Sequence, residues 1–598
     1  MKRFLRPLQT VCAVLLAYGA AEILFHLADA QSTRRQSLAW LLVFFLVLLG
    51  YRRAAKVRER RAALAAAIAA AVLAVLTVLG REISAAHRIA GIIDSAQNML
   101  LFVWRVLCMA SVFYIPLVFF FFHGGRLCAV PRPAGAPARL SGPQRFAALW
   151  AVILLCWLPY FLAFYPGIMS IDSHRQLEQA LGAMPLSDAH PVMHTALIAL
   201  CVRIAALLGR PSACVALYSG LQMLSLSAAL AYACATMFRW GTPRWAAWGT
   251  CAFFALAPMH PSLGMTMWKD VPHAAATLLL VIQLMDCARE PEAFFASAGS
   301  FKRLAALVAT MFLFGTLRHN GFYVCLLALP FFLWAFRAHW KRALAVCLAA
   351  VALLGVYRGP VLRAVTQERG SVTEFLSIPV QFIARMAVYR AEELSEEDKD
   401  IIGEILPYAK LTELYNPTIA DPVKHSIDEE AFGANPRRYA SLFLRLAGRY
   451  PGVLLESFLS GNFGYWYPET YFLVTVYAMR DNSAGAQRRS IGIQDTQLHN
   501  WIEHRFGLTP GVAMLLSIGA MMWVVALAAA LLAYKRRRDL LLPFVPLLFL
   551  WLSLLGSAVF AEYRYAYGVI VCAPICMGAA LAAARKTGAL QGDGVSWQ

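Results

Sequence analysis

The chain has 598 residues, of which 60% are hydrophobic, and its mean hydropathy is +0.59. Soluble domains rarely exceed about half apolar residues, so this composition indicates an integral membrane protein and excludes an ordinary soluble enzyme. The formal charge of +20 would suggest nucleic acid in a soluble protein, but in a membrane protein Lys and Arg mark the cytoplasmic loops. We therefore expect a lipid bilayer and no nucleic acid as partner.

Apolar runs without strand-like alternation predict an all-α polytopic membrane protein rather than a β-barrel. A helix needs about 20 apolar residues to cross a bilayer. In chain order, we predict fourteen transmembrane helices at 8–28, 37–51, 62–80, 98–122, 147–165, 213–237, 244–260, 270–287, 303–318, 320–337, 341–357, 511–534, 540–560 and 565–585. The basic start of the chain precedes no convincing cleavage site, so the first helix is expected to remain.

Basic loops set the expected topology, because Lys and Arg are enriched on the cytoplasmic side. Fourteen spans place both termini in the cytoplasm of a bacterial inner membrane, together with the loops at 1–6, 52–61, 126–145, 239–244, 289–303, 337–342, 535–538 and 585–586. The apolar segment 190–209 must then not span, since a further span would invert four later basic loops. We predict an in-plane or re-entrant helix there, and Arg203 within it agrees, because a charge at mid-membrane is costly.

This topology divides the chain into four parts. Residues 1–146 hold the N-terminal transmembrane helices, and 147–357 form a transmembrane module whose outer loop spans 166–212. Residues 358–510 form a mostly helical extracytoplasmic domain, and 511–598 hold the last helices and a short cytoplasmic tail.

Polar clusters from distant parts of the chain fall on the outer face in this topology. Charged residues beside membrane helices are expensive and usually functional. The candidate site residues are Asp172, His174, Gln176, His190, His194, Lys269, Asp270, Arg318, His319, Asn320 and Arg564.

Each of the main candidates has two interpretations. Asp172 is a general base that takes a proton from an acceptor hydroxyl, or a residue capping the helix that Ser-Ile-Asp-Ser opens. Lys269 and Arg318 hold a phosphate, or anchor helix ends at the interface. Asp270 is a cap, a partner of Lys269 or a metal ligand. His190 and His194 share a helix face and could bind a metal ion together, but no third metal ligand lies at a spacing typical of such sites.

The motifs IDSHRQ, HPVMHT, WKD, RHNG, LSIPVQFIAR and YNPTIADPVK resemble a family of uncharacterised bacterial membrane proteins of the GT-C superfamily of glycosyltransferases. The similarity covers roughly residues 150–570. It implies a GT-C-like fold with in-plane helices in the first outer loop. It also implies transfer of a sugar from a polyprenyl-phosphate-linked donor to a glycan, lipid or protein acceptor on the extracytoplasmic side.

The same resemblance implies roles for single residues. Asp172 would be the base, and Lys269, Arg318 and Arg564 would hold the lipid phosphate. His174, His190 and Asp270 would bind sugar or orient the acid. Members with known activity carry paired acids in this loop, whereas Ser173 follows Asp172 here. The need for a divalent cation such as Mg or Mn therefore stays open.

Two other function classes compete with this enzyme. A transporter or flippase of a lipid-linked or anionic substrate would carry its charges at mid-membrane and show repeated halves. No internal repeat is visible, and the polar clusters gather at one face. A non-catalytic assembly protein should tolerate Asp172→Asn.

Overall fold

The computed structural model describes residues 2–27, 38–124, 140–368, 370, 372–468, 478–506, 509, 511–557 and 561–589. Within these ranges the chain is helical and forms no β-strand beyond isolated bridges. Residues 125–139 of a predicted basic loop and the tail at 590–598 lie outside the described residues.

Every predicted span corresponds to a helix in the described part of the chain. Nine helical stretches there are long and apolar enough to cross a membrane, which makes this a multi-pass membrane protein. The count of fourteen spans stays a prediction, because the other five helices do not meet both criteria over their described residues. The helices are α1 (Lys2–Leu27), α2 (Leu38–Ala54), α3 (Arg60–Ala86), α5 (Ala96–His123), α6 (Gly142–Ala163), α9 (Cys214–Trp240), α10 (Arg244–Leu256), α12 (Asp270–Arg289), α14 (Ser300–Leu317), α15 (His319–Ala335), α16 (Trp340–Val356), α26 (Ile518–Tyr534), α27 (Phe544–Ser557) and α28 (Tyr563–Ala589).

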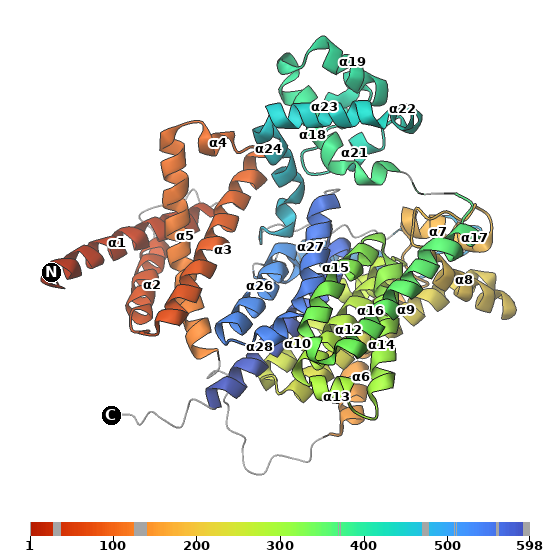
Figure 1. Cartoon of the computed structure of the whole chain (residues 1–598), viewed down its shortest axis with the longest axis horizontal. Helices are drawn as coiled ribbons and strands as arrows, with labels where there is room; N and C mark the ends of the chain where they lie inside the picture. Colours follow the sequence, from red (N-terminus) through yellow and green to blue (C-terminus); the bar gives the residue numbers. More distant parts are fainter. Residues whose placement is uncertain are drawn as a thin grey trace.

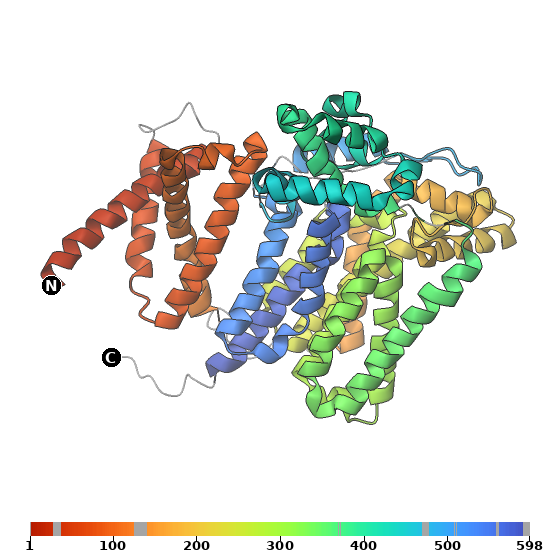
Figure 2. The same cartoon turned by 45° about the horizontal axis from the view of Figure 1, so that its top comes forward.

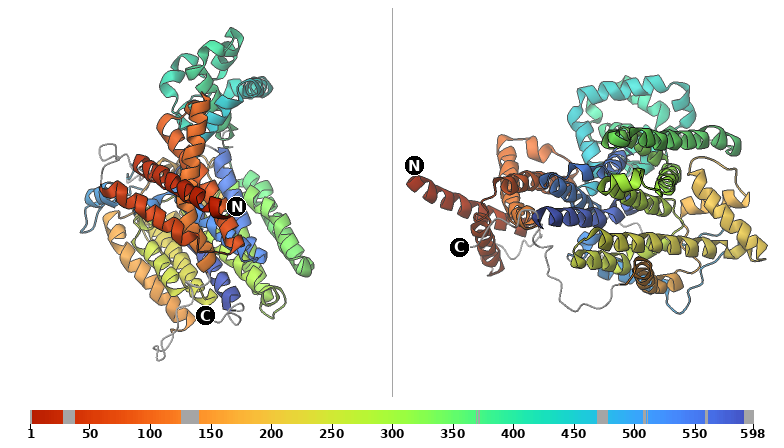
Figure 3. Two further views of the ribbon diagram at one scale, coloured as in Figure 1. Left: turned by 90° about the vertical axis from the view of Figure 1, so that its left-hand side faces the viewer. Right: turned by 60° about the horizontal axis from the view of Figure 1, so that its bottom comes forward.

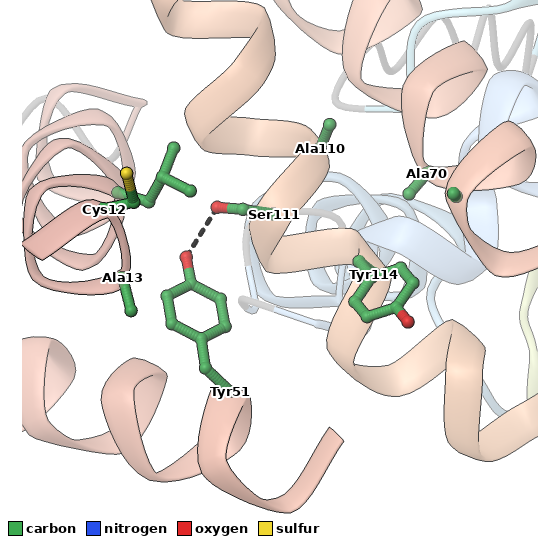
Figure 4. Close-up of a pocket in the computed structure, with 9 residues that line it drawn as sticks. Cys12, Ala13, Tyr51, Ala70, Ala110, Ser111 and Tyr114 are labelled. Carbon is green, nitrogen blue, oxygen red and sulfur yellow. Dashed lines mark hydrogen bonds between the residues drawn. The ribbon is translucent and has the colours of Figure 1, made fainter. Parts of the chain in front are cut away.

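The first helices α1, α2, α3 and α5 form a group beside the main bundle, at the left of Figure 1. This group contains an apolar cavity of about 430 Å³ between α1, α2, α3 and α5. Its main polar feature is a hydrogen bond of 2.6 Å between the hydroxyls of Tyr51 and Ser111 (Figure 4). The cavity lies on the opposite side of the molecule from α7 (Ile171–Leu181) in Figure 1.

Helix α28 is the central helix of the main bundle. Its side chains are buried along nearly all of the apolar stretch from Tyr563 to Arg585. It packs against α26, α12, α9 and α27. A helix that is apolar all round is expected in such a buried position.

Helices α7 and α8 (Val192–Leu207) occupy the outer loop that the sequence assigns to the membrane surface. Figure 2 shows both at the end of the bundle that carries α23 (Pro436–Arg449), running across the direction of the bundle helices. The Arg203 side chain is exposed on α8. This placement agrees with an in-plane helix.

The residues between α18 (Ser377–Tyr389) and α24 (Pro451–Asn462) pack around a hydrophobic core of their own. Ser395 begins α19 (Glu396–Ile405) with a capping box that uses Asp398. The remaining helices are α20 (Leu411–Leu414), α21 (Asp421–Lys424), α22 (Glu429–Ala434) and α23. The left view of Figure 3 shows this unit at one end of the bundle and the C-terminal end of α28 at the other.

Helix α12 runs from one end of the bundle to the other. It begins at Asp270 among the predicted site residues and ends at Arg289, whose guanidinium donates to the Trp240 carbonyl at 3.0 Å. At this second end Arg239 pairs with Asp286 at 2.7 Å. Twenty helical residues span about 30 Å, the thickness of the hydrocarbon layer. The polar cluster and the basic loops therefore lie at opposite ends of the bundle, as charge counting predicts.

Candidate functional site

Two loops run side by side and bring the starts of α7 and α12 together. The Ile168 N–H donates to the Met265 carbonyl at 2.9 Å, and the Met267 N–H donates to the Ile168 carbonyl at 3.1 Å. The Ser173 hydroxyl donates to the Met267 carbonyl at 2.7 Å. Trp268 donates its indole N–H to the Ser170 hydroxyl at 2.6 Å. Asp172 and Lys269 thereby become neighbours although they are far apart in the sequence.

Gly167 is required at the turn before these loops. Its φ is +155°, a conformation that side chains rarely adopt, and a Cβ would collide with the Ser219 side chain. The turn can therefore approach α9 only with glycine at this position.

The Asp172 carboxylate lies between two cations. Its Oδ2 is 3.1 Å from Nη1 of Arg564 and 3.7 Å from Nζ of Lys269. Asp172 stands in the first turn of α7, whose N-cap is Ser170. Its side chain therefore engages the two cations rather than capping its own helix.

Arg564 is held on several sides. Its Nε donates to the Glu562 carboxylate at 2.6 Å, and its Nη2 donates to the Tyr565 hydroxyl at 3.0 Å. The guanidinium carbon lies 4.6 Å from the ring centroid of Trp268 and 4.8 Å from that of Tyr565. These cation–π contacts fix the guanidinium plane beside Asp172.

Burial alone would raise the pKa of Asp172, but Lys269 and Arg564 outweigh it and hold the pKa well below its usual range. Asp172 is consequently ionised at neutral pH. Burial lowers the pKa of Lys269, and the charges of Asp172 and Asp270 oppose that effect.

Glu562 is a site residue that the sequence-based prediction does not include. Its side chain is only 2% exposed and contacts Nε of Arg564, whereas Asp172 contacts Nη1. Burial raises the pKa of Glu562 to about 7, although Arg564 favours its ionised form. The sequence feature that could have identified Glu562 is its position two residues before an arginine, at the start of an apolar helix.

A second ion pair lies next to the first. Arg318 contacts Asp270 at 2.9 Å, and the Asp270 side chain is 1% exposed. Arg318 also donates to the Tyr565 carbonyl at 3.1 Å, and its guanidinium lies over the Tyr565 ring. None of the three predicted roles for Asp270 names this partner, and the structure pairs Asp270 with Arg318. We call these six residues the charged cluster: Asp172, Lys269, Asp270, Arg318, Glu562 and Arg564.

Two histidines border the charged cluster. The Nδ1 of His190 lies 2.9 Å from Nζ of Lys269. Burial and the Lys269 ammonium lower the pKa of His190 to about 3, so this imidazole is neutral and accepts from the lysine. His319 lines a small hollow next to Arg318, together with Asp188, Tyr357 and Arg358.

Other predicted site residues lie in separate contacts. Gln176 and His194 belong to a buried network in which His194 contacts Gln176 at 2.9 Å and the Tyr218 hydroxyl at 2.6 Å. His174 faces Glu178 at 3.5 Å, and Asn320 donates to the Ser553 hydroxyl at 2.8 Å. Gln176, His194 and Asn320 thereby connect different helices, whereas His174 and Glu178 lie on the same helix α7.

No group of three or more His, Cys, Asp or Glu within the described ranges is arranged to hold a metal ion. Both ring nitrogens of His194 already contact other side chains. Asp172 and Asp270 each face a cation of the protein. These residues do not fit a His–carboxylate metal site, and we derive no step through a metal.

Comparison with known proteins matches the chain to a protein family. A family model described as "Family of unknown function (DUF6020)" matches residues 182–592, more than half of the chain. The matched segment includes Lys269, Arg318 and Arg564, and Asp172 precedes it by ten residues (182 − 172). No curated protein and no solved structure is significantly similar to the chain.

Proposed function

Since the chain belongs to the DUF6020 family, whose function is unknown, we propose a function from the site itself. The protein is an integral-membrane glycosyltransferase that moves a sugar from a polyprenyl-phosphate-linked donor to an acceptor. The reaction takes place on the extracytoplasmic side of the bacterial inner membrane. The acceptor is a glycan, a lipid or a protein that offers a hydroxyl group.

One observation carries this proposal: a carboxylate lies within 4 Å of two cations at the end of a membrane bundle, where a lipid head group would lie. The Asp172 side chain is 30% exposed, so an acceptor can reach it. Lys269 lies directly before the membrane helix α12, and Arg564 lies in the first turn of α28, so a lipid-linked anion can meet them at the interface.

The cations of the charged cluster suit a phosphate ester. Arginine offers a planar set of donors that matches phosphate oxygens, and lysine binds phosphate as a point charge. Arg564 is oriented by Glu562 and two aromatic rings, and Arg318 is oriented by Asp270. Such orientation lowers the cost of binding, because the donors already have their final geometry.

The reaction balances with these groups. The acceptor oxygen forms a bond to the anomeric carbon of the sugar, while the bond from that carbon to the phosphate oxygen breaks. The acceptor proton passes to Asp172, and the lipid phosphate leaves on Lys269 and Arg564. The base acts on a hydroxyl that becomes acidic only as the new bond forms.

Replacing Asp172 by Asn tests this assignment. Loss of a positioned base is expected to lower transfer by about 100-fold or more. The measurement is transfer from lipid-linked sugar in membranes that contain the full chain, alongside the surface glycans of the cells. Lys269→Gln should also lower transfer, because it weakens phosphate binding.

Asp400→Asn is the matched control, since Asp400 is an exposed acid on α19. It should transfer sugar at the normal rate. Normal transfer by Asp172→Asn, at normal expression, would rule out the base assignment and favour the assembly protein.

A further inference from the structure

One oxygen of Asp172 receives both cations of the proposed phosphate site. Oδ2 is the atom that Arg564 contacts at 3.1 Å and that Lys269 faces at 3.7 Å. Carboxylate and phosphate oxygens make the same charge-assisted contacts with lysine and arginine. The position of Oδ2 is therefore a position that a phosphate oxygen would take on these two residues.

Asp172 is also the carboxylate of the charged cluster that can move away from its cation partners. Its side chain is 30% exposed, whereas Glu562 is 2% and Asp270 is 1% exposed. Moving a buried carboxylate out of its ion pair leaves the buried cation without a counter-charge, which is costly. Asp172 is partly exposed, so its carboxylate can meet water when it turns away, and its exchange costs less than that of the two buried acids.

We propose that a phosphate group enters this site by exchange, taking the place of Asp172 Oδ2 on Lys269 and Arg564 while the Asp172 side chain turns toward the acceptor side. Glu562 stays in place and keeps Arg564 oriented. This inference rests on the proposed function, because it concerns how the donor phosphate of that function binds.

The exchange imposes an order on the reaction. Before the donor binds, Lys269 and Arg564 hold the pKa of Asp172 low, so it is a weak base. After exchange, those cations neutralise the phosphate, and the phosphate charge itself lies close to the released carboxylate. Asp172 then becomes more basic. The base is ready only when a donor is present, which limits transfer without donor.

Phosphate affinity tests the exchange directly. The full chain is purified in nanodiscs, and binding of inorganic phosphate and of geranylgeranyl phosphate is measured by calorimetry at pH 8. Asp172→Asn should bind both probes about tenfold more tightly, which corresponds to about 1.4 kcal/mol, because phosphate no longer competes with a carboxylate. Lys269→Gln should bind both more weakly. Geranylgeranyl phosphate should bind more tightly than inorganic phosphate, because the proposed donor is a lipid.

Glu562→Gln separates exchange from simple repulsion. Glu562 contacts the same arginine and, with a pKa of about 7, is ionised at pH 8. It leaves Asp172 in place, so its effect should be clearly smaller than tenfold. Equal tightening in Glu562→Gln and Asp172→Asn would overturn the exchange. Unchanged or weaker binding by Asp172→Asn, in protein that elutes as the normal species, would overturn it too.

Neither probe carries a sugar, so the result does not depend on catalysis. If phosphate binds as expected and Asp172→Asn still transfers sugar normally, the proposed function falls while the exchange stands. If transfer requires Asp172 but its removal weakens phosphate binding, the function stands while the exchange falls.

Discussion

The cations of the charged cluster are each matched with a carboxylate from another part of the chain. Lys269 and Arg564 face Asp172, and Arg318 contacts Asp270. Removing one partner of a buried ion pair leaves an uncompensated charge. The site is consequently stable without substrate, and a ligand has to compete for its cations.

The raised pKa of Glu562 predicts that the stability difference between Glu562→Gln and the natural chain depends on pH. Its pKa is about 7 in the folded protein, against 4.5 for the free side chain, so folding disfavours its ionised form. This cost is absent below about pH 4.5, grows as the pH rises to about 7, and is then constant. Glu562→Gln has no such cost. The variant should therefore gain stability relative to the natural chain between pH 5 and 8, by up to about 3 kcal/mol.

The measurement is the Tm of both proteins in the same detergent across that pH range. Asp400→Asn serves as the control for the loss of one carboxylate, because Asp400 is exposed on α19. A Glu562→Gln difference that falls with rising pH would show that Arg564 dominates and that Glu562 is stabilised as an anion.

The sequence predicts the members of the charged cluster better than their partners. Asp172, Lys269 and Arg564 are visible as polar residues beside apolar runs. The segment 562–565 is visible as a polar cluster, but Glu562 is not among the predicted site residues, because only the fold shows its contact with Arg564. Likewise, nothing local pairs Asp270 with Arg318 rather than with its neighbour Lys269. Ion pairs between distant segments depend on packing, which periodicity and charge counting do not describe.

At the scale of elements, a buried polar network connects α7 and α8 to the bundle. His194 of α8 contacts Gln176 of α7 and Tyr218 of α9. The Tyr218 hydroxyl donates to Gln222, whose amide donates to the Thr266 carbonyl at 2.6 Å. The network ends in the loop that carries Lys269. It therefore positions both sides of the site.

Tyr218→Phe should lower stability by about 1–3 kcal/mol, because the buried Nε2 of His194 and the Gln222 side chain would each lose a partner. Tyr232→Phe is the matched control on the same helix, since Tyr232 is 41% exposed. The check is the Tm of each purified variant. Equal Tm values for the two variants would mean that the network does not stabilise the in-plane helices.

Hydropathy and charge predict elements well where one physical rule dominates. The apolar helices follow from hydropathy, and the prediction that α8 lies in the membrane plane rests on the basic loops and on Arg203. The pairing of Ile168 with Met265 and Met267 is invisible in the sequence, because two short loops carry no period. Yet this pairing is what brings Asp172 to Lys269.

At the scale of the whole molecule, one buried arginine joins the unit between α18 and α24 to the N-terminal helices. Arg385 of α18 pairs with Glu456 of α24 at 2.9 Å and donates to the His87 carbonyl after α3. Glu456 also accepts from the Ile89 N–H at 2.9 Å. The N-terminal group is thus fixed to the unit above the bundle by a charged pair whose arginine is 1% exposed.

Arg385→Ala should loosen this junction. The Ile89 amide would still donate to Glu456, but Arg385 would no longer fix the Glu456 side chain. Amide hydrogen exchange at residues 87–93 should therefore become about tenfold faster or more. Arg390→Ala is the control, because Arg390 pairs with Glu393 at the surface. Unchanged exchange in Arg385→Ala would show that apolar packing alone fixes the N-terminal group.

The two ends of the bundle predict an orientation in the membrane. Asp270 and Arg289 lie at opposite ends of α12, and the positive-inside rule assigns the Arg289 end to the cytoplasm. A cysteine in place of Asp400, exposed on the unit above Asp172, should react with an impermeant thiol reagent in intact cells. A cysteine in place of Gly299, exposed in the basic loop after Arg289, should react only after the membrane is opened. Both are compared with the parent chain, which accounts for its own cysteines. The reverse pattern would place the charged cluster in the cytoplasm, where the proposed transfer would use a donor on the inner leaflet.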